Sequence, residues 1–255
     1  MSVPVLMYHH VLPQSGFITS SVMEFEAQMR YLANNGYHTL SADEFLAYKK
    51  GELKVGKKSV LITFDDGWRD NYVYAFPVLK KYGLRATIFL VTGWIEAASE
   101  QVGAEFIPAP HSKAKAMASQ NPGALFLNWD EVGKMREAGI DFHSHTHGHS
   151  DAYFGTLSLE QELAMCRQTL KRRLGFDDTH LCWPRGKYDK AAINAAKQAG
   201  YEILYTTKRG INRANGELEA IKRIGAKGDE RWLAKTLAIY SNDILGGIYS
   251  LLKPN

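Results

Sequence analysis

Short apolar runs rich in β-branched and aromatic residues alternate along this chain with longer segments of helical period. Seven of these runs predict strands, at residues 3–8, 59–64, 86–91, 139–143, 180–183, 202–207 and 220–226. Apolar strands that alternate with amphipathic helices are typical of a parallel sheet covered by helices. The pattern therefore predicts an α/β protein.

Polar residues mark the ends of several predicted helices. Three pairs have the spacing of a capping box: Ser21 with Glu24, Ser41 with Glu44, and Asn128 with Glu131. Residues 159–174 keep one apolar face over four turns and stop before Gly175, which suits a left-handed C-terminal position. Pro77 should kink the helix expected after residue 70, or delay its start.

One long segment, residues 96–127, has poor periodicity. We expect it to be an insertion over the mouth or edge of the sheet, where it forms part of a substrate groove or a plain surface loop. The sequence shows no internal repeat and no low-complexity tract. The sequence therefore predicts a single domain over residues 1–255 that carries this insertion.

Clusters of polar residues follow four of the predicted strands. They are "YHH" at 8–10, "DDG" at 65–67, "HSHTHGH" at 143–149 and "WPRGK" at 183–187. In a barrel of parallel strands, the carboxyl ends of all strands open on one face, where active sites assemble. We therefore expect the four clusters to meet at one rim.

The acidic and histidine clusters together suit a catalytic metal site. One carboxylate and two imidazoles with an open position are a common zinc arrangement, which Asp66 and two of the four histidines would supply. Such a metal polarises a carbonyl and lowers the pKa of bound water from 15.7 to about 7, so Asp65 could act as general base. The alternatives are a simple Asp-Gly turn and a solvated histidine tract with adventitious metal affinity.

The other two clusters could supply a proton donor and an oxyanion site. His9 or His10 could protonate a departing amine, although either residue taken singly is more typical of a packed or surface histidine. Trp183, Pro184 and Gly186 suit a rigid turn that presents backbone N–H groups to an oxyanion and an indole to a sugar ring. A simpler alternative is a loop in which Asp189 caps the next helix.

The overall composition excludes several classes of protein. With 45% hydrophobic and 23% charged residues among 255, the chain should fold, and neither disorder nor a fibre is indicated. The formal net charge is +4, but the basic residues are scattered, so no nucleic-acid partner is predicted. Cys166 and Cys182 both lie in apolar patterns, so no disulfide framework is implied.

Residues 1–10 lack the basic region, long apolar run and cleavage site of a signal peptide. This predicts a protein that is cytoplasmic or peripheral to the inner membrane, or periplasmic or extracellular if a signal segment was removed. No stretch reaches the ~18–20 apolar residues of a spanning helix. Residues 232–255 should pack on the domain as a last helix and extension, with peripheral contact to a membrane as the alternative. The oligomeric state is not predicted.

Three motifs together resemble the polysaccharide deacetylase family, the NodB-homology domain of carbohydrate esterase family four. They are "TFDDG" at 63–67, "SHTHGH" at 144–149 and "WPRG" at 183–186, and the resemblance covers nearly the whole chain. It implies a distorted (β/α) barrel of about seven parallel strands. It also implies metal-dependent removal of N-acetyl groups from amino sugars in a polysaccharide or a lipid-linked glycan precursor.

The resemblance also implies roles for individual residues. Asp65 would be the base, and the backbone at Arg185 would help to form the oxyanion site. The divalent metal, most often zinc with cobalt, nickel or iron as alternatives, would be held by Asp66, His145 and His149. A competing frame of the second motif would use His143 and His147 instead.

Two departures from the family pattern affect these roles. No histidine follows His180, so the histidine that usually acts as the general acid near the C-terminus is missing. The stretch "PVLMYHHV" resembles the N-terminal motif of the subgroup that deacetylates poly-β-1,6-N-acetylglucosamine. This resemblance makes His9 the proton-donor candidate. Cys182 stands where the family often has an arginine that pairs with the base. Arg185 could pair with Asp65 instead, or bind an anionic part of a substrate. A catalytically weak carbohydrate-binding domain, or an amidase or esterase acting on a non-sugar substrate, are the alternative functions.

Overall fold

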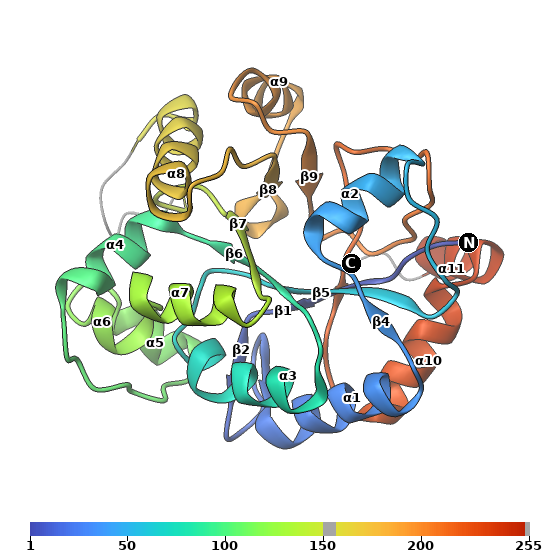
Figure 1. Cartoon of the computed structure of the whole chain (residues 1–255), viewed down its shortest axis with the longest axis horizontal. Coiled ribbons are helices and arrows are strands. Elements are labelled where there is room, and N and C mark those ends of the chain that lie inside the picture. Colours follow the sequence, from blue (N-terminus) through green and yellow to red (C-terminus); the bar gives the residue numbers. More distant parts are fainter. Residues whose placement is uncertain (150–156, 253–255) are drawn as a thin grey trace.

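A parallel sheet curled into a half-barrel forms the centre of the molecule, and helices surround it (Figure 1). The computed structural model describes residues 1–149 and 157–252. Strand order along the main sheet is β10-β1-β5-β6-β7-β8-β9, and β4 pairs with β5. The strands are β1 (Val5–Tyr8), β4 (His38–Thr39), β5 (Ser59–Phe64), β6 (Thr87–Leu90), β7 (Asp141–Ser144), β8 (His180–Cys182), β9 (Ile203–Tyr205) and β10 (Ile224–Gly225).

The predicted fold class is confirmed, and each of the seven predicted strands is present. Strand β5 has the predicted bounds, whereas β10 is limited to two residues of the predicted run 220–226. Sequence reasoning missed β4 and a small second sheet of β2 (His10–Leu12) and β3 (Thr19–Ser21). These strands have two or three residues, which is too short for a period of two to be recognised.

The segment that leads into β10 contacts both ends of the curled sheet. Leu6 in β1 pairs with Ile62 on one side and with Ile224 on the other. Ile221, three residues earlier, forms a bridge to Tyr205 in β9. The sheet is therefore drawn towards a barrel, and the carboxyl ends of its strands face one mouth.

Helices occupy most of the connections between strands. They are α1 (Val22–Asn34), α2 (Ala42–Lys50), α3 (Phe76–Tyr82), α4 (Thr92–Glu100), α5 (His111–Met117), α6 (Pro122–Leu125), α7 (Trp129–Glu137), α8 (Leu159–Leu174), α9 (Lys190–Gln198), α10 (Glu230–Tyr240) and α11 (Asp243–Leu252). The three predicted capping boxes are present at the starts of α1, α2 and α7. Gly175 ends α8 with a φ of 80°, as predicted.

Pro77 delays the start of a regular helix, as the sequence predicted. A π-helical turn, η1 (Asn71–Ala75), comes first, and α3 then begins with Pro77 in its first turn. Proline has no backbone N–H to donate, and the first turn of a helix is where that donor is not needed.

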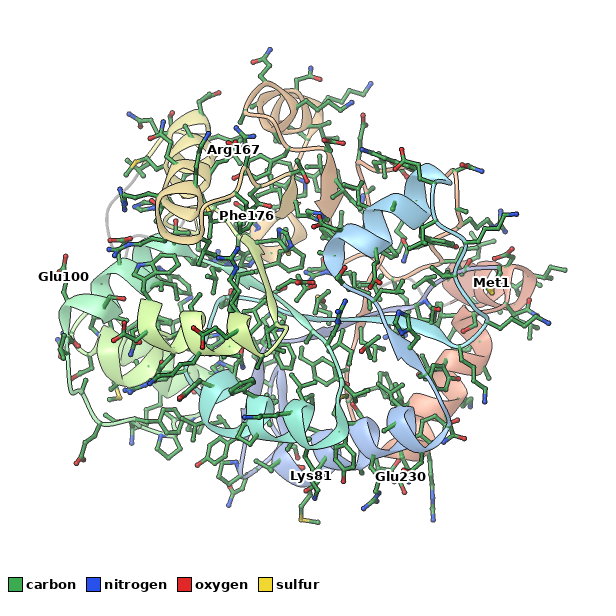
Figure 2. All side chains as sticks on the ribbon, in the orientation of Figure 1. Met1, Lys81, Glu100, Arg167, Phe176 and Glu230 are labelled. Atoms are coloured by element: carbon green, nitrogen blue, oxygen red, sulfur yellow. The ribbon has the colours of Figure 1, made fainter. Side chains whose placement is uncertain are left out.

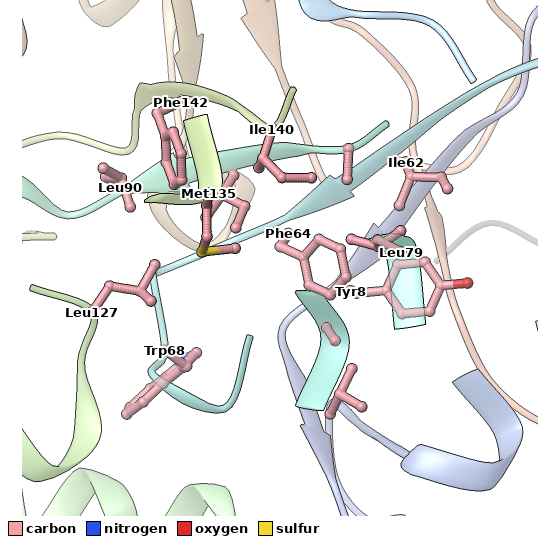
Figure 3. Packing of buried hydrophobic residues seen from close by; sticks show 14 of the residues in the cluster. Tyr8, Ile62, Phe64, Trp68, Leu79, Leu90, Leu127, Met135, Ile140 and Phe142 are labelled. Atoms are coloured by element: carbon pink, nitrogen blue, oxygen red, sulfur yellow. The ribbon is translucent and has the colours of Figure 1, made fainter. Parts of the chain in front are cut away.

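Strand β5 is buried over all six of its residues, because the curled sheet is covered on both faces. Figure 3 shows Phe64 at its end beside Tyr8 of β1, and their ring centroids lie 5.2 Å apart. Each such side chain contributes roughly 1.5–3 kcal/mol when it is fully buried. Charged side chains lie outside this core: Figure 2 shows Lys81, Glu100 and Glu230 at the periphery of the molecule. The packing of Phe64 against Tyr8 fixes where β5 ends, and the motif "DDG" at 65–67 begins directly after it.

The segment at 96–127 contains more helix than its poor periodicity predicted. Residues 96–100 complete α4, and α5 and α6 follow. Both later helices are too short, at seven and four residues, to show a helical period. Arg69 ties the segment to the barrel, because its Nη1 donates to the carbonyl oxygens of Ala104 and Gly123, each at 2.6 Å.

The last two helices differ in how they pack. Four residues of α10 are buried, as predicted for a helix that packs on the domain. Helix α11 buries only Gly246 and leaves five large apolar side chains exposed: Ile244, Leu245, Ile248, Leu251 and Leu252. Among the described residues, no helix combines the length and the apolarity needed to cross a membrane. Peripheral contact with a membrane stays a prediction, and residues 253–255 of this tail lie outside the described part.

Candidate active site

A cavity of about 330 Å³ opens at the carboxyl ends of β1, β5, β7 and β8. Its lining includes the six residues that the sequence predicted for catalysis and metal binding: His9, Asp65, Asp66, His145, His149 and Arg185. Each of them follows the end of a strand. The expectation that distant polar clusters meet at one rim is met for these residues.

Asp66, His145 and His149 form a compact group of possible metal ligands. The Oδ1 atom of Asp66 lies 3.3 Å from Nε2 of His145 and 3.5 Å from Nε2 of His149. Nδ1 of His145 lies 2.8 Å from the carbonyl oxygen of Cys182. A carbonyl can only accept, so Nδ1 carries a hydrogen and Nε2 is the nitrogen directed towards Asp66.

The backbone around this group is bent into unusual conformations. Asp66, Thr146, His149 and Arg185 all have positive φ values, between 56° and 76°. Such conformations are costly for residues with a Cβ atom and gather at functional sites. The turn at Thr146 redirects the chain after β7, and its Oγ1 accepts a hydrogen bond of 3.1 Å from the N–H of His149.

The carboxylate of Asp66 is also held from its other side. Nε1 of Trp68 donates a hydrogen bond of 2.8 Å to Oδ2 of Asp66. Burial by itself would raise the pKa of Asp66, but the hydrogen bond from His145 and the nearby His149 hold that pKa well below its usual value. Asp66 is therefore ionised and has Oδ1 directed to the two imidazoles, which suits a carboxylate ligand.

The competing pair of histidines points elsewhere. Nδ1 of His143 lies 2.7 Å from Oδ1 of the buried Asp178, and the centroid of its ring lies 4.2 Å from that of the tilted His180 ring. Nδ1 of His147 lies 2.9 Å from Oγ1 of Thr92. Neither histidine lines the cavity. Of the two frames that the sequence left open, the structure brings only the pair His145 and His149 to Asp66.

Asp65 is bound by a buried arginine that the sequence analysis did not identify. Nη1 and Nη2 of Arg223 donate to the two carboxylate oxygens of Asp65 at 2.6 and 2.7 Å, and Nε donates to the carbonyl oxygen of Thr206 at 2.8 Å. Burial would raise the pKa of Asp65, but the Arg223 charge and its two hydrogen bonds lower that pKa below its usual value. Asp65 is thus an ionised carboxylate in a fixed orientation.

The pairing with Asp65 that the sequence suggested for Arg185 is supplied by Arg223, which donates to both carboxylate oxygens. Arg223 lies just before β10, in the predicted strand 220–226, between Ile221 and Ile224. A charged residue within an apolar strand was the available signal. Only the pairing of β10 with β1 brings this residue beside Asp65.

Asp65, His145 and Cys182 form a second group with atoms within ligand distance. This group suits a metal less well. Arg223 already binds both oxygens of Asp65, and burial raises the pKa of the Cys182 thiol, which disfavours the thiolate that a metal needs. The Cys182 Sγ atom instead accepts a contact of 3.0 Å from Nη2 of Arg223.

The two histidines after β1 have different surroundings. Nε2 of His9 lies 3.7 Å from Oδ2 of Asp65, and burial lowers the pKa of His9 despite the nearby carboxylates. His10 does not line the cavity. Its Nδ1 lies 2.7 Å from Asp70, and its ring packs on Trp68 at 4.3 Å. Of these two candidates, the structure brings only His9 to the base.

The third motif contributes less to the cavity than the sequence suggested. Trp183 is 2% exposed, packs in a cluster with Leu181 and stacks on Tyr188, so its indole is not available as a wall for a sugar ring. Pro184 is also buried. The N–H of Gly186 donates to the carbonyl oxygen of Trp183 at 2.9 Å, and a Cβ atom there would collide with Thr207. These three residues shape the turn, and they are not cavity contacts.

Arg185 is the member of this turn that reaches the cavity. It is exposed and has a φ of 56°. The simpler alternative for the loop also holds, because the side chain of Asp189 caps α9 by accepting from the N–H of Ala192 at 2.8 Å. The turn thus both positions Arg185 and starts the next helix.

The family model for polysaccharide deacetylases matches residues 52–204, which is more than half of the chain and includes the three motifs. The chain belongs to the polysaccharide deacetylase family. This agrees with the resemblance seen in the sequence.

Two curated relatives and one solved structure, each named as a deacetylase, are also similar to this chain. YxkH of Bacillus subtilis, which is named for the same family, is 31% identical over 222 residues, covering 87% of this chain and 70% of its own length. The poly-β-1,6-N-acetyl-D-glucosamine N-deacetylase of Escherichia coli K12 is 22% identical over 254 residues, which cover 86% of this chain but only 36% of the relative. The structure of the Streptococcus pyogenes deacetylase PplD in complex with acetate has a TM-score of 0.75 and 26% identity, and the match covers 93% of this chain and 98% of that one.

Several residues that line the cavity of this polysaccharide deacetylase were missed by sequence reasoning. Trp94, Trp68, Phe17 and His111 form much of its aromatic wall, and the Trp94 ring lies 5.3 Å from that of His149. Trp68 directly follows the acidic motif, which was a usable signal. The other three lie in segments whose position over the cavity depends on tertiary packing.

Proposed function

We propose that this member of the family hydrolyses the N-acetyl group of amino sugars, N-acetylglucosamine in particular, in a polysaccharide or a lipid-linked glycan precursor. The observation that carries the proposal is one cavity in which the group Asp66, His145 and His149 lies beside an ionised Asp65 held by Arg223. The name of the Escherichia coli relative supports the choice of sugar.

Asp66, His145 and His149 are the residues that would hold a divalent metal. One carboxylate and two imidazoles are a donor set that zinc, cobalt, nickel or iron accepts, and zinc is the first choice. The orientation of His145 by the Cys182 carbonyl supports this assignment, because ligand histidines are usually fixed through their second nitrogen. When bound, the metal would polarise the acetyl carbonyl and lower the pKa of water at the site.

Asp65 is the proposed general base. Because Arg223 keeps its carboxylate ionised and fixed, Asp65 can accept a proton from the water that attacks the acetyl carbonyl carbon. His9, 3.7 Å away, is the proposed proton donor to the amine nitrogen as the C–N bond breaks. The products are acetate and a free amino sugar. Asp65 gains one proton from the water, and the protonated His9 loses one to the amine nitrogen, so the number of protons is conserved.

The backbone at Arg185 is the proposed contact for the oxyanion. Its strained conformation and its place in the cavity lining support this role. Backbone donors can stabilise developing charge without moving during the reaction. The Arg185 side chain, exposed at the rim, would be able to bind an anionic part of a substrate.

Release of acetate is the direct test of this proposal. We expect the purified chain, supplied with Zn²⁺, to release acetate from β-1,6-linked N-acetylglucosamine oligomers, and we expect a chelator to reduce the rate at least about a hundredfold. Binding of the oligomer without acetate release would favour a carbohydrate-binding domain. Hydrolysis of non-sugar amides or esters alone would favour the third alternative.

Replacing single histidines tests the ligand assignment. We expect His145→Ala and His149→Ala to weaken metal binding at least about a hundredfold, because each removes one of three ligands. The matched controls are His147→Ala, whose imidazole contacts Thr92, and Cys182→Ser, which removes the thiol of the second group. Metal content after dialysis is the measurement. Full metal retention in His145→Ala would return the assignment to the other pair.

A further inference from the structure

A second cavity, of about 520 Å³, adjoins the active-site cavity. One side is formed by residues 12–17 and Thr19, from the end of β2 to the start of β3, and the other by Pro108, Pro110 and the first two residues of α5, His111 and Ser112. The two cavities share Phe17 and His111. These two residues therefore stand at the boundary between the active-site cavity and the second cavity.

We propose that the second cavity binds the sugar next to the one that is deacetylated, with Phe17 as its stacking platform. This inference rests on the proposed function and deepens it, because it makes the substrate a chain of at least two linked sugars. It assigns the aromatic wall, which the sequence placed at Trp183, to Phe17 instead.

Phe17 has the features of a binding residue. It is 77% exposed, although it carries a large apolar ring. Its loop is held tightly, since Gly16 and Thr19 exchange two backbone hydrogen bonds of 3.1 and 3.2 Å. The next residue, Ile18, has a φ of 47° and also lines the active-site cavity. An exposed aromatic ring beside a strained residue on a fixed loop is typical of a ligand contact.

The chemistry of the second cavity suits an uncharged sugar. Pro13, Pro108 and Pro110 give it apolar surfaces, while Gln14 and Ser112 give it neutral hydrogen-bonding groups. No aspartate, glutamate, lysine or arginine lines it within the described residues. A pyranose has an apolar face of C–H groups and a rim of hydroxyls, so it matches this lining. An anionic polymer would need cations here, and the volume is in the range of small-molecule sites.

The wall between the two cavities is held in place by a buried chain of hydrogen bonds. Nδ1 of His111 lies 3.3 Å from Nε2 of His10, and Nδ1 of His10 lies 2.7 Å from Asp70. His10 and Asp70 are both buried. The ring centroids of Phe17 and His111 lie 5.8 Å apart. A sugar at the junction thus meets one aromatic ring that is exposed and one that is fixed.

The experiment compares substrates with and without a neighbouring sugar. For the wild type we expect a higher kcat/KM on β-1,6-linked N-acetylglucosamine pentamer than on the methyl glycoside of N-acetylglucosamine. In Phe17→Ala, the ratio of kcat/KM for the pentamer to kcat/KM for the methyl glycoside should fall roughly three- to tenfold, because KM for the pentamer rises. Phe17→Trp should restore this ratio. Met23→Ala is the matched control, because Met23 is similarly exposed on α1 and does not line either cavity.

A binding measurement gives a readout that does not depend on turnover. In an Asp65→Asn background, the pentamer should quench the fluorescence of Trp68 and Trp94, which line the active-site cavity, and adding Phe17→Ala should raise the Kd by the same factor. An unchanged ratio and an unchanged Kd in Phe17→Ala, with an active wild type, would overturn this inference alone. No acetate release from either sugar by the wild type would overturn the proposed function.

Discussion

Asp65→Asn is expected to abolish acetate release while the metal-binding group stays intact. The amide cannot accept the proton of the attacking water, and loss of a general base typically costs about 10²–10⁴ in rate. Asp65 is separate from the group of Asp66, His145 and His149, so metal content should match the wild type. Acetate release and metal content, measured on the same preparation, check both parts.

The matched control for this variant is Asp189→Asn, which keeps an oxygen that can cap α9 and lies outside the cavity lining. It should retain full activity and metal. Asp65→Asn also leaves Arg223 without its anion, so its thermal midpoint should be recorded. An active Asp65→Asn would remove the proposed base, and loss of its metal would favour the group that contains Cys182.

Arg223→Met is expected to lower the free energy of unfolding by about 3–5 kcal/mol and to reduce activity. The guanidinium is fully buried and donates two hydrogen bonds to the Asp65 carboxylate, so its loss leaves a buried charge without its bidentate partner. Arg223→Lys should recover only part of the effect, because an ammonium cannot form the two parallel bonds. Urea unfolding followed by fluorescence measures the change in stability.

A double variant separates the pair from a general loss of packing. Asp65→Asn with Arg223→Met leaves neither charge alone in the interior, so it should be more stable than the sum of the two single changes predicts. Arg185→Met is the exposed control and should unfold like the wild type. Additive losses in the double variant would mean that Arg223 stabilises the fold through contacts other than Asp65.

Local signals were sufficient for most of the fold. The run at 59–64 is apolar throughout because β5 is covered on both faces, and the capping pair Ser21 and Glu24 acts within one turn of helix. Both are properties of neighbouring residues. The strands β2, β3 and β4 escaped because each has only two or three residues, so its pairing partner defines it and no pattern of its own does.

The candidate site also contains residues that local signals located and residues whose orientation only tertiary contacts determine. Asp65 and Asp66 could be located because a motif follows a strand whose carboxyl end must reach the rim. The resemblance favoured His145 and His149, but the residues alone could not rank the two pairs, because the turn at Thr146 and the Asp178 carboxylate decide where each ring points. Trp183 was assigned wrongly, since an aromatic residue beside Pro-Arg-Gly looks the same in a sequence whether it is buried or exposed.

The sequence by itself determined the seven longer strand segments, the α/β class, the positions of the motifs at strand ends and the family, because these depend on patterns within short segments. Only the tertiary structure decided that Arg223 binds Asp65, that His145 and His149 turn towards Asp66, and that Phe17 and His111 stand between two cavities. Each of these contacts joins residues far apart in the chain. Their distance is set by how the strands pair and the sheet curls, and no local pattern records it.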